Sequence, residues 1–167
     1  NKTKGNLNRI ASFVVMFKRN QLITSTIFED PAELSDSLLG IEKESLRIKD
    51  NGISDINIQD KIGPSLCNRY ITTDFSESLL EFITPPFKSN NGAFLFLEDI
   101  HNYFYKKINM ETLWPMSMPL NVKDSSAIQI AEYGKSNLGQ FKHLYRRGLA
   151  NRYGKLMQII SGVHFNY

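Results

Sequence analysis

The segment 41–48 limits the fold of this chain more than any other feature, and its sequence is Ile-Glu-Lys-Glu-Ser-Leu-Arg-Ile. The alternation predicts a β-strand, because successive side chains of a strand point to opposite faces. Glu42 and Glu44 then share one face with Leu46 and Ile48. For the two acids alone, a solvent-facing strand is the simpler interpretation. The apolar Leu46 and Ile48 on the same face argue against this interpretation, because a strand face that is half acidic and half apolar is unusual when it is fully exposed to solvent.

Other segments predict further strands and helices. The expected strands are 70–73, 76–84 and 159–167. A helix competes at 76–84, and the Pro85-Pro86 pair that follows favours the strand. The expected helices are 91–109, with a stripe of Phe94, Leu97, His101, Phe104 and Ile108, and 138–158, interrupted at Gly148 and Gly154. Asp50-Asn51-Gly52 predicts a turn, Asp30-Pro31 a helix start, and 53–69 and 111–137 mostly irregular structure.

The composition narrows the class of protein. The chain has 167 residues, 41% hydrophobic and 22% charged, as in a globular domain or a piece of a larger one. A net charge of +3 without a dense Lys/Arg stretch argues against a nucleic-acid partner. Cys67 is the single cysteine, expected to be a free structural thiol in a reducing, cytoplasmic compartment. The apolar run 10–17 is too short to span a bilayer and lacks a cleavage site, so no membrane partner is expected.

Acidic residues of a second strand could join those of the first. Glu77 and Glu81 are four apart and share a face on either a strand or a helix, and Asp74 lies just upstream. His164 and Asn166 share a face of the last expected strand. Mg²⁺ binds proteins through a few carboxylates while substrate phosphates complete its shell, and Mn²⁺ also accepts imidazole. These residues alone predict no more than a possible Mg²⁺ site on a sheet.

The remaining candidate residues leave alternatives open. Neither a Walker-type phosphate loop nor a dinucleotide fingerprint is present in the sequence. Arg146 and Arg147, which follow Tyr145, could bind anionic substrate groups or could form an ordinary helix surface. His101 is expected to be a packed, hydrogen-bonded residue. His143, among basic neighbours, is expected at the surface.

Five motifs, in order along residues 40–167, resemble those of the proteobacterial glutamate–cysteine ligases. The segment 40–47 is similar to the family motif Gly-Ile/Leu-Glu-Arg-Glu-Thr-Leu-Arg, and 71–85 to its second signature. The others are 113–119, 131–137 with 142–145 and 151–154, and 157–166. One motif could arise by chance, whereas five in the family's order are specific. Residues 1–39 carry no comparable signal.

The resemblance implies a fold and a reaction. The fold is α+β and related to glutamine synthetase, with an antiparallel curved sheet and outer helices. ATP phosphorylates the γ-carboxylate of glutamate, and the cysteine amine then attacks the acyl phosphate, in the first step of glutathione synthesis. Mg²⁺, with Mn²⁺ as a substitute, neutralises the crowded negative charge and aligns the phosphoryl group.

By matched position, the resemblance also implies the site residues. One metal would have the ligands Glu42, Asp74 and Glu81, a second would share Glu42 with His164, and a third would bind Glu44. The substrate-binding residues would be Gln158 for glutamate, Phe75, Tyr145, Leu149 and Ile160 around the cysteine side chain, and Arg146 for anionic groups. No catalytic side chain is assigned. Lys43 and Ser45 depart from the family's Arg and Thr, and the strand pattern turns both away from the carboxylates.

Residues 1–39 are expected to be a partly helical lead-in, and 40–167 a truncated N-terminal part of the catalytic domain, with the rest of the site beyond Tyr167. The partners are then glutamate, cysteine, ATP and the remainder of the polypeptide, and the isolated chain is expected to be inactive. Two alternatives stay open. One is a related carboxylate–amine ligase with another acceptor amine. The other is a non-catalytic binding module, which would not depend on divalent cations.

Overall fold

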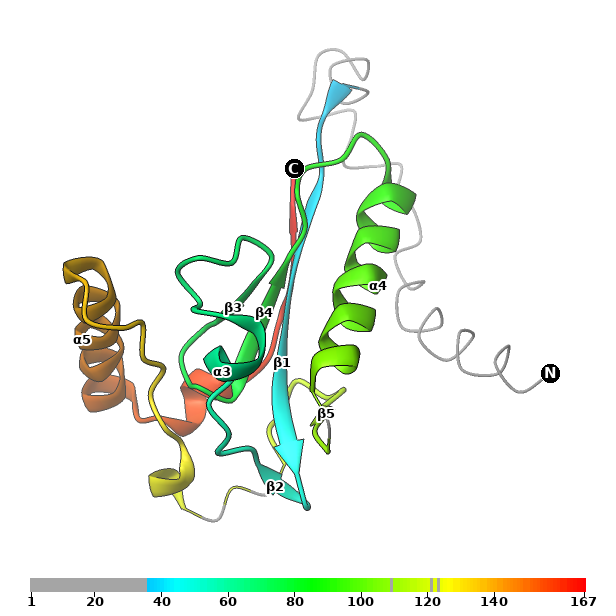
Figure 1. Ribbon diagram of the computed structural model, residues 1–167. Coiled ribbons are helices and arrows are strands. Elements are labelled where there is room, and N and C mark those ends of the chain that lie inside the picture. Colours follow the sequence, from blue (N-terminus) through cyan, green and yellow to red (C-terminus); the bar gives the residue numbers. More distant parts are fainter. Residues whose placement is uncertain (1–35, 109, 121, 123) are drawn as a thin grey trace, which may run out of the picture. The chain divides into compact units, whose positions relative to one another are not determined.

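Strand β1, Gly40–Lys49, is the longest of the strands and pairs with most of the others. The computed structural model describes residues 36–108, 110–120, 122 and 124–167, and in this part of the chain the sheet has six strands, all paired antiparallel (Figure 1). The other strands are β2 (Gly52–Ile53), β3 (Ile71–Thr73), β4 (Leu79–Ile83), β5 (Thr112–Leu113) and β6 (Val163–Asn166). The predicted α+β class with an antiparallel sheet is confirmed.

The hairpin between β1 and β2 confirms the turn predicted at 50–52. Asp50 and Asn51 have φ angles of 48° and 63°, and Lys49 pairs with Gly52. Two consecutive residues with positive φ match a two-residue turn whose twist suits the flanking strands, and Asp and Asn tolerate this conformation better than most residues. This tight turn fixes the register at the end of β1.

Helix α4, Asn90–Lys107, covers one face of the sheet. Its Leu97 and Phe104 pack in one core cluster with Leu80 and Phe82 of β4. Ser89 caps the helix by accepting a hydrogen bond from the backbone of Gly92, as is common at helix starts. The predicted helix is confirmed. Its buried face is rotated relative to the predicted stripe, and the buried residues are Ala93, Leu97, Ile100 and Phe104.

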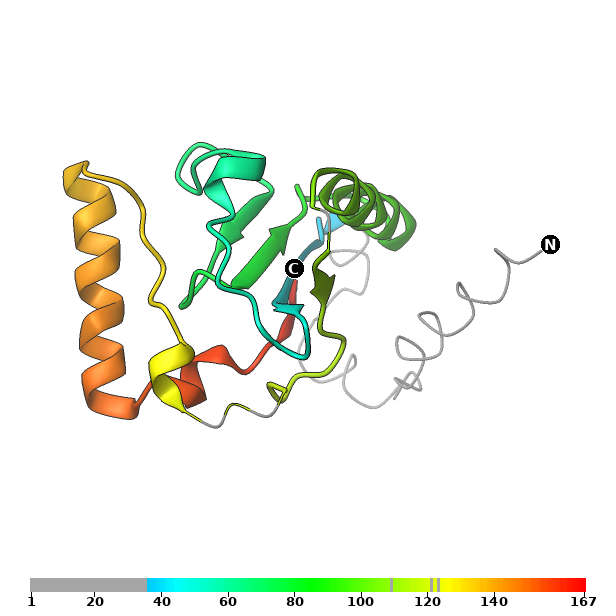
Figure 2. The same ribbon diagram turned by 60° about the horizontal axis from the view of Figure 1, so that its bottom comes forward.

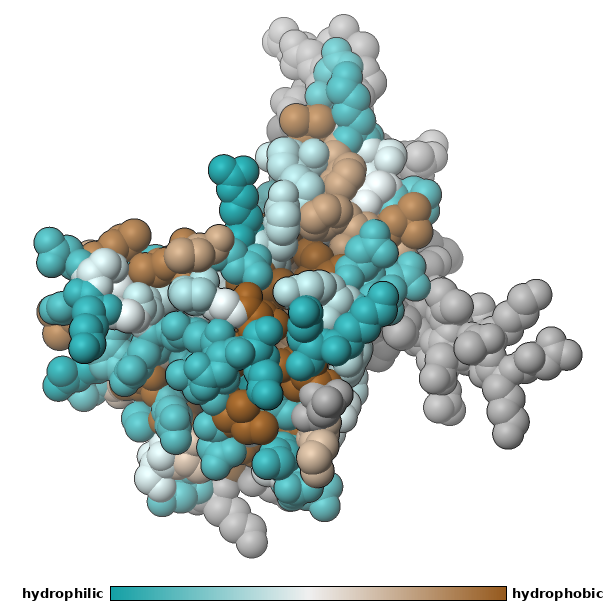
Figure 3. Space-filling view, viewed as in Figure 1, coloured by the Kyte–Doolittle hydropathy of each residue, from teal (hydrophilic) through white to brown (hydrophobic). Residues whose placement is uncertain are grey.

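Helix α5, Asn137–Tyr153, lies far from α4, and in both views the strands lie between the two helices (Figure 1 and Figure 2). The interruption expected at Gly148 is wrong, because one glycine weakens a helix without ending it. The helix ends before Gly154, whose φ of 78° suits glycine. Leu138 and Phe141 are exposed, and Figure 3 shows apolar surface over this helix.

A buried ion pair joins β1 to the segment before β5. The Arg47 guanidinium donates to both carboxylate oxygens of Glu111 at 2.9 Å, and both side chains are fully buried. Arg47 also donates to the backbone oxygens of Ile56 and Glu77. Removing either charge would leave the other buried and unpaired, which typically costs about 3–5 kcal/mol.

Three short helices complete the described elements: α3 (Gln59–Ile62), inside the stretch expected to be irregular, and two 3-10 helices, Ser125–Ala127 and Leu156–Ile159. Residues Leu38–Tyr167 form one compact unit. Among the described residues, no helix is both long and apolar enough to cross a membrane. The predictions for the run 10–17, for Asp30-Pro31 and for most of the lead-in 1–39 lie outside the described residues.

Candidate functional site

The strand register brings the acidic residues of β1 together with those of β4 and β6. Glu44 pairs directly with Glu81 of β4, and Glu42 pairs with His164 of β6. Directly paired residues lie on the same face of an antiparallel sheet, with Cβ atoms about 4.5–5.5 Å apart. The face shared by Glu42 and Glu44, inferred from their spacing, therefore also carries Glu81 and His164.

Asp74 joins the same face from the end of β3. Thr72 pairs with Glu81, and Asp74 lies two residues further, where its backbone nitrogen donates to Leu79. The charge of Asp74 acts on both Glu44 and Glu81. The structure therefore gathers all the predicted metal-binding residues in one acidic cluster: Glu42, Glu44, Asp74, Glu81 and His164. We use this name for them below.

Burial and electrostatic repulsion act together on the carboxylates of the acidic cluster. Burial, followed by the charges of Asp74, Glu42 and Glu44, raises the pKa of Glu81 to about 7. Burial is also the main cause of the raised pKa of Glu44, opposed by its hydrogen bond from Gly162. Carboxylates that repel one another in a partly buried place favour protons or metal cations. Binding of protons or cations would therefore reduce the repulsion within the acidic cluster.

Gly162 shapes one side of the acidic cluster. Its backbone nitrogen donates to Glu44 Oε2 at 2.6 Å, and its oxygen accepts from the backbone of Glu44 at 2.9 Å. A Cβ atom at this position would lie 3.0 Å from His164 Nε2 and 3.5 Å from Glu44 Oε2. His164 Nδ1 lies 3.5 Å from Glu42 Oε2. The absence of a side chain at Gly162 therefore leaves room between two candidate ligands.

The acidic cluster suits a hard divalent cation by its chemistry. Carboxylate oxygens and one imidazole are ligands that Mg²⁺ or Mn²⁺ accepts. Within the residues that the structure describes, no group of three His, Cys, Asp or Glu side chains is arranged closely enough to hold a metal ion as it stands. The cluster therefore supplies suitable donors and space but no finished coordination shell, and Mg²⁺ usually completes its shell with water and substrate phosphates.

Four of the predicted substrate-binding residues lie in or next to a second core cluster, whose buried residues are Leu46, Phe75, Leu79, Ile128 and Ile159. Phe75 is buried there beside Leu46 and Leu79, and Leu149 of α5 packs against it. Tyr145 is exposed on α5. Gln158 and Ile160 are half-buried, one at each side of the buried Ile159.

Arg146, predicted to bind anionic groups, lies against Asp74. Its Nε donates to the backbone oxygen of Asp74 at 2.5 Å, and its Nη2 is 3.8 Å from the Asp74 carboxylate. Its Nη1 donates to the backbone oxygen of Lys142 at 3.1 Å. The guanidinium is thus next to the acidic cluster, with contacts from each of its nitrogens to residues of this chain.

Several other candidate residues lie elsewhere. Glu77 does not share the face of Glu81, because β4 begins only at Leu79 and the Glu77 carboxylate accepts from the backbone of Glu132. His101 is packed against Phe82 and hydrogen-bonded to the backbone oxygen of Leu97, as predicted.

His143 is not a plain surface residue. Its side chain is half-buried and its Nδ1 is hydrogen-bonded to the backbone oxygen of Ala131. Cys67 is free and exposed, as predicted.

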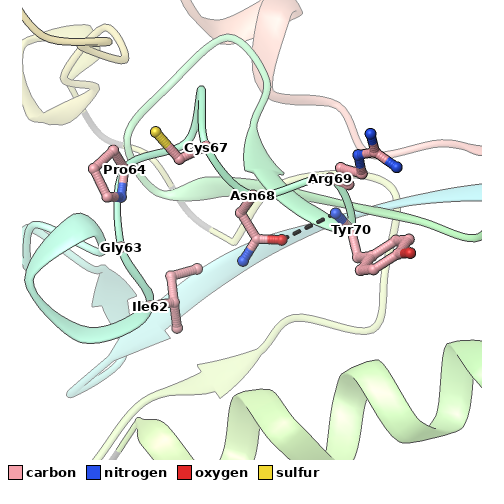
Figure 4. A pocket seen from close by; sticks show the side chains of 7 residues that line it. All are labelled: Ile62, Gly63, Pro64, Cys67, Asn68, Arg69 and Tyr70. Atoms are coloured by element: carbon pink, nitrogen blue, oxygen red, sulfur yellow. Dashed lines mark hydrogen bonds between the residues drawn. The ribbon is translucent and has the colours of Figure 1, made fainter.

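A separate shallow hollow of about 370 Å³ precedes β3 (Figure 4). Cys67, Arg69 and Tyr70 line it, together with Asn68, whose side-chain oxygen accepts from the backbone of Tyr70. None of the predicted site residues lines this hollow. Its shape and lining therefore give no reason to place the chemistry there.

Sequence reasoning missed two residues that contact the acidic cluster. Gly162 was part of a motif but had no assigned role, and its signal could have been its position two residues before His164. Tyr133 lies in another motif, and its hydroxyl reaches the backbone oxygen of Asp74 at 2.7 Å. Only the folded chain brings Tyr133 and Asp74 together, so no local pattern could have shown this contact.

The family model described as Glutamate-cysteine ligase matches residues 25–167. The chain belongs to the glutamate–cysteine ligase family. Its sequence is 48% identical over 129 residues to the glutamate–cysteine ligase of Erwinia tasmaniensis, covering 77% of this chain and 25% of that protein. It is 50% identical over 140 residues to that of Buchnera aphidicola subsp. Baizongia pistaciae, covering 83% and 27%.

Two solved structures show that the likeness extends to the fold. A Francisella tularensis glutamate–cysteine ligase in complex with AMP has a TM-score of 0.74 and 44% identity, over 77% of this chain and 26% of that one. A bifunctional glutathione synthetase from Pasteurella multocida has a TM-score of 0.67 and 33% identity, over 79% and 17%. The chain thus spans about a quarter of the length of its curated glutamate–cysteine ligase relatives.

Proposed function

We propose that the full-length protein containing this sequence is an ATP-dependent glutamate–cysteine ligase that forms γ-glutamylcysteine in the cytoplasm. The observation that carries the proposal is the acidic cluster, in which strand register brings Glu44 to Glu81 and Glu42 to His164 in a chain of this family. A non-catalytic binding module has no need of half-buried acids that repel one another on one face.

The acidic cluster would hold Mg²⁺ at the transferring phosphoryl group. Glu42, Asp74 and Glu81 would bind one ion, His164 would share a second with Glu42, and Glu44 would bind a third. Bound Mg²⁺ would neutralise the phosphate oxygens and align the γ-phosphoryl group of ATP with the γ-carboxylate of glutamate. This chain's residues contribute by fixing the carboxylates on rigid strands, which limits reorganisation during the reaction.

The residues around the second core cluster would receive the amino-acid substrates. Phe75, Tyr145, Leu149 and Ile160 would line an apolar place for the cysteine side chain, and Gln158 would lie near glutamate. Arg146 would add positive charge beside Asp74, where anionic groups must approach the acidic cluster. Phosphorylation turns the glutamate carboxylate into an acyl phosphate with a good leaving group, and the cysteine amine then displaces phosphate.

Phosphate release from ATP by the full-length protein tests this function. We expect release to require glutamate, cysteine and Mg²⁺ together, and Glu81→Gln to lower it by at least about a hundredfold. The matched control is Glu98→Gln, on the exposed side of α4, which we expect to be as active as the wild type.

The outcomes separate the alternatives. Turnover with another amine in place of cysteine would keep the ligase class and reject the named acceptor. Independence from both Mg²⁺ and Glu81 would reject the site. Because this chain spans only about a quarter of its relatives, we also expect the 167-residue chain alone to form no γ-glutamylcysteine, and detectable product would contradict this.

A further inference from the structure

We infer that Tyr133 is a positioning residue that holds Asp74 in place within the acidic cluster and ties that position to helix α5. The inference rests on the proposed function, because it takes Asp74 as a metal ligand. Tyr133 is 5% exposed, and its hydroxyl lies 2.7 Å from the backbone oxygens of both Thr73 and Asp74. One hydroxyl proton thus bridges two successive carbonyl groups at the point where β3 ends.

Arg146 supports the same peptide group from α5. Its Nε donates to the backbone oxygen of Asp74 at 2.5 Å, so this carbonyl receives donors from both Arg146 and Tyr133. A carbonyl oxygen has two lone pairs and can accept both. Fixing the Asp74 backbone on both sides restricts the directions open to its carboxylate, which has 38% side-chain exposure beside Glu44 and Glu81.

The ring of Tyr133 is held by two cations of α5. The Arg146 guanidinium lies 4.7 Å from the ring centroid, and Lys142 Nζ lies 5.2 Å from it. Such cation–π contacts are attractive, and they are stronger when they are shielded from water. The Tyr133 ring therefore contacts α5, while its hydroxyl contacts the backbone of Asp74.

The backbone of Tyr133 is also packed directly against α5. A Cβ atom on Gly139 would collide with the backbone oxygen of Tyr133, so only glycine allows this close approach. The side chain of His143 contacts the backbone oxygen of Ala131, two residues before Tyr133, at 2.9 Å. Tyr133 thus links α5, which carries the proposed cysteine-lining residues Tyr145 and Leu149, to the metal side of the site.

The test is Tyr133→Phe in the full-length protein, because this change removes the hydroxyl and keeps the ring for Arg146 and Lys142. The matched control is Tyr105→Phe, which removes another hydroxyl that contacts backbone, at Leu113 N, on the α4 side. The probe is Mn²⁺ alone, with its affinity measured by electron paramagnetic resonance, and the thermal midpoint is measured for each variant.

We expect Tyr133→Phe to weaken Mn²⁺ binding by about tenfold or more, in the range seen when groups that orient metal ligands are removed. Tyr105→Phe should bind Mn²⁺ like the wild type, even if its thermal midpoint falls. Wild-type Mn²⁺ affinity in Tyr133→Phe, with or without a loss of thermal stability, would show a merely structural role and overturn the inference.

A third variant, Asp74→Asn, separates this inference from the proposed function. If Asp74→Asn weakens Mn²⁺ binding and Tyr133→Phe does not, only the inference falls. If Asp74→Asn also binds Mn²⁺ like the wild type, the metal site itself is rejected and the inference falls with it.

Discussion

The two faces of the β1–β4 pair differ in how they are closed. On the α4 face, Ile41, Leu80 and Phe82 are buried with the apolar residues of α4. On the opposite face, Leu46 and Leu79 are equally buried, but the next residues along β1 are acidic. Glu44 pairs with Glu81 of β4, and Glu42 pairs with Ile83 of β4 and with His164 of β6. We call the face covered by α4 the closed face, and the opposite face the open face.

The difference indicates that the closed face stabilises the fold, and we propose that the open face binds the metal. A buried apolar residue contributes about 1.5–3 kcal/mol, which favours a closed face. Half-buried carboxylates that repel one another oppose folding and suit a face that receives cations. We therefore expect changes on the closed face to affect stability first and changes on the open face to affect metal binding first.

A large effect on stability is expected for Phe82→Ala on the closed face. Phe82 is fully buried against Phe104 and His101, so its deletion should lower the free energy of unfolding by about 3–5 kcal/mol. Its neighbour Ile83 points to the open face and is only half-buried, so Ile83→Ala should cost less than about 2 kcal/mol. Urea unfolding of both variants makes the comparison, and equal losses would contradict it.

A smaller effect concerns the pH dependence of the closed face. Burial, with a contribution from the charge of Lys43, lowers the pKa of His101 to about 4 from its ordinary value of 6.5. The unfolded chain therefore binds more protons between these values, and stability is lost as the pH falls through this window. The loss by pH 4 should be on the order of 2–3 kcal/mol.

The variant His101→Gln isolates this contribution, because glutamine does not titrate. Thermal midpoints at pH 7 and pH 5 should differ less in the variant than in the wild type. An identical pH dependence in both proteins would show that His101 does not become charged on unfolding in this range.

Adding a single methyl group at Gly162 should weaken metal binding on the open face. A Cβ there would crowd His164 Nε2 and Glu44 Oε2, so Gly162→Ala should raise the Mg²⁺ concentration for half-maximal ligase activity by about tenfold. Gly52→Ala is the matched control, because its Cβ would meet only Lys49 O at 3.7 Å, an ordinary contact. The idea fails if both variants need the same Mg²⁺ concentration.

The sequence predicted the open face better than it predicted the contacts around it. The period of two placed Glu42 and Glu44 on one side of β1, and the structure confirms this. The pairing of Glu44 with Glu81 follows from long-range register, which a local pattern does not contain. Glu77 was misplaced because β4 begins at Leu79 and not at Ser76.

Contacts between distant segments could not be predicted either, because a local sequence pattern does not contain long-range pairing. Tyr133 and Asp74 are 59 residues apart, and backbone pairing of Ala131 with Phe75, which no local pattern contains, helps to bring them together. The interruption expected at Gly148 failed because propensity describes an isolated helix. The metal-binding roles still depend on the family resemblance and stay predictions.

Mn²⁺ binding to the full-length protein, measured by equilibrium dialysis, tests the open face most directly. The variant is Glu44→Gln with Glu81→Gln, and the matched control is Glu98→Gln with Asp99→Asn, which removes the same charge from exposed positions of α4. We predict that the first pair of changes weakens Mn²⁺ binding by at least about a hundredfold and that the control binds like the wild type. Equal affinities in the two double variants would contradict the assignment of the open face as the metal site.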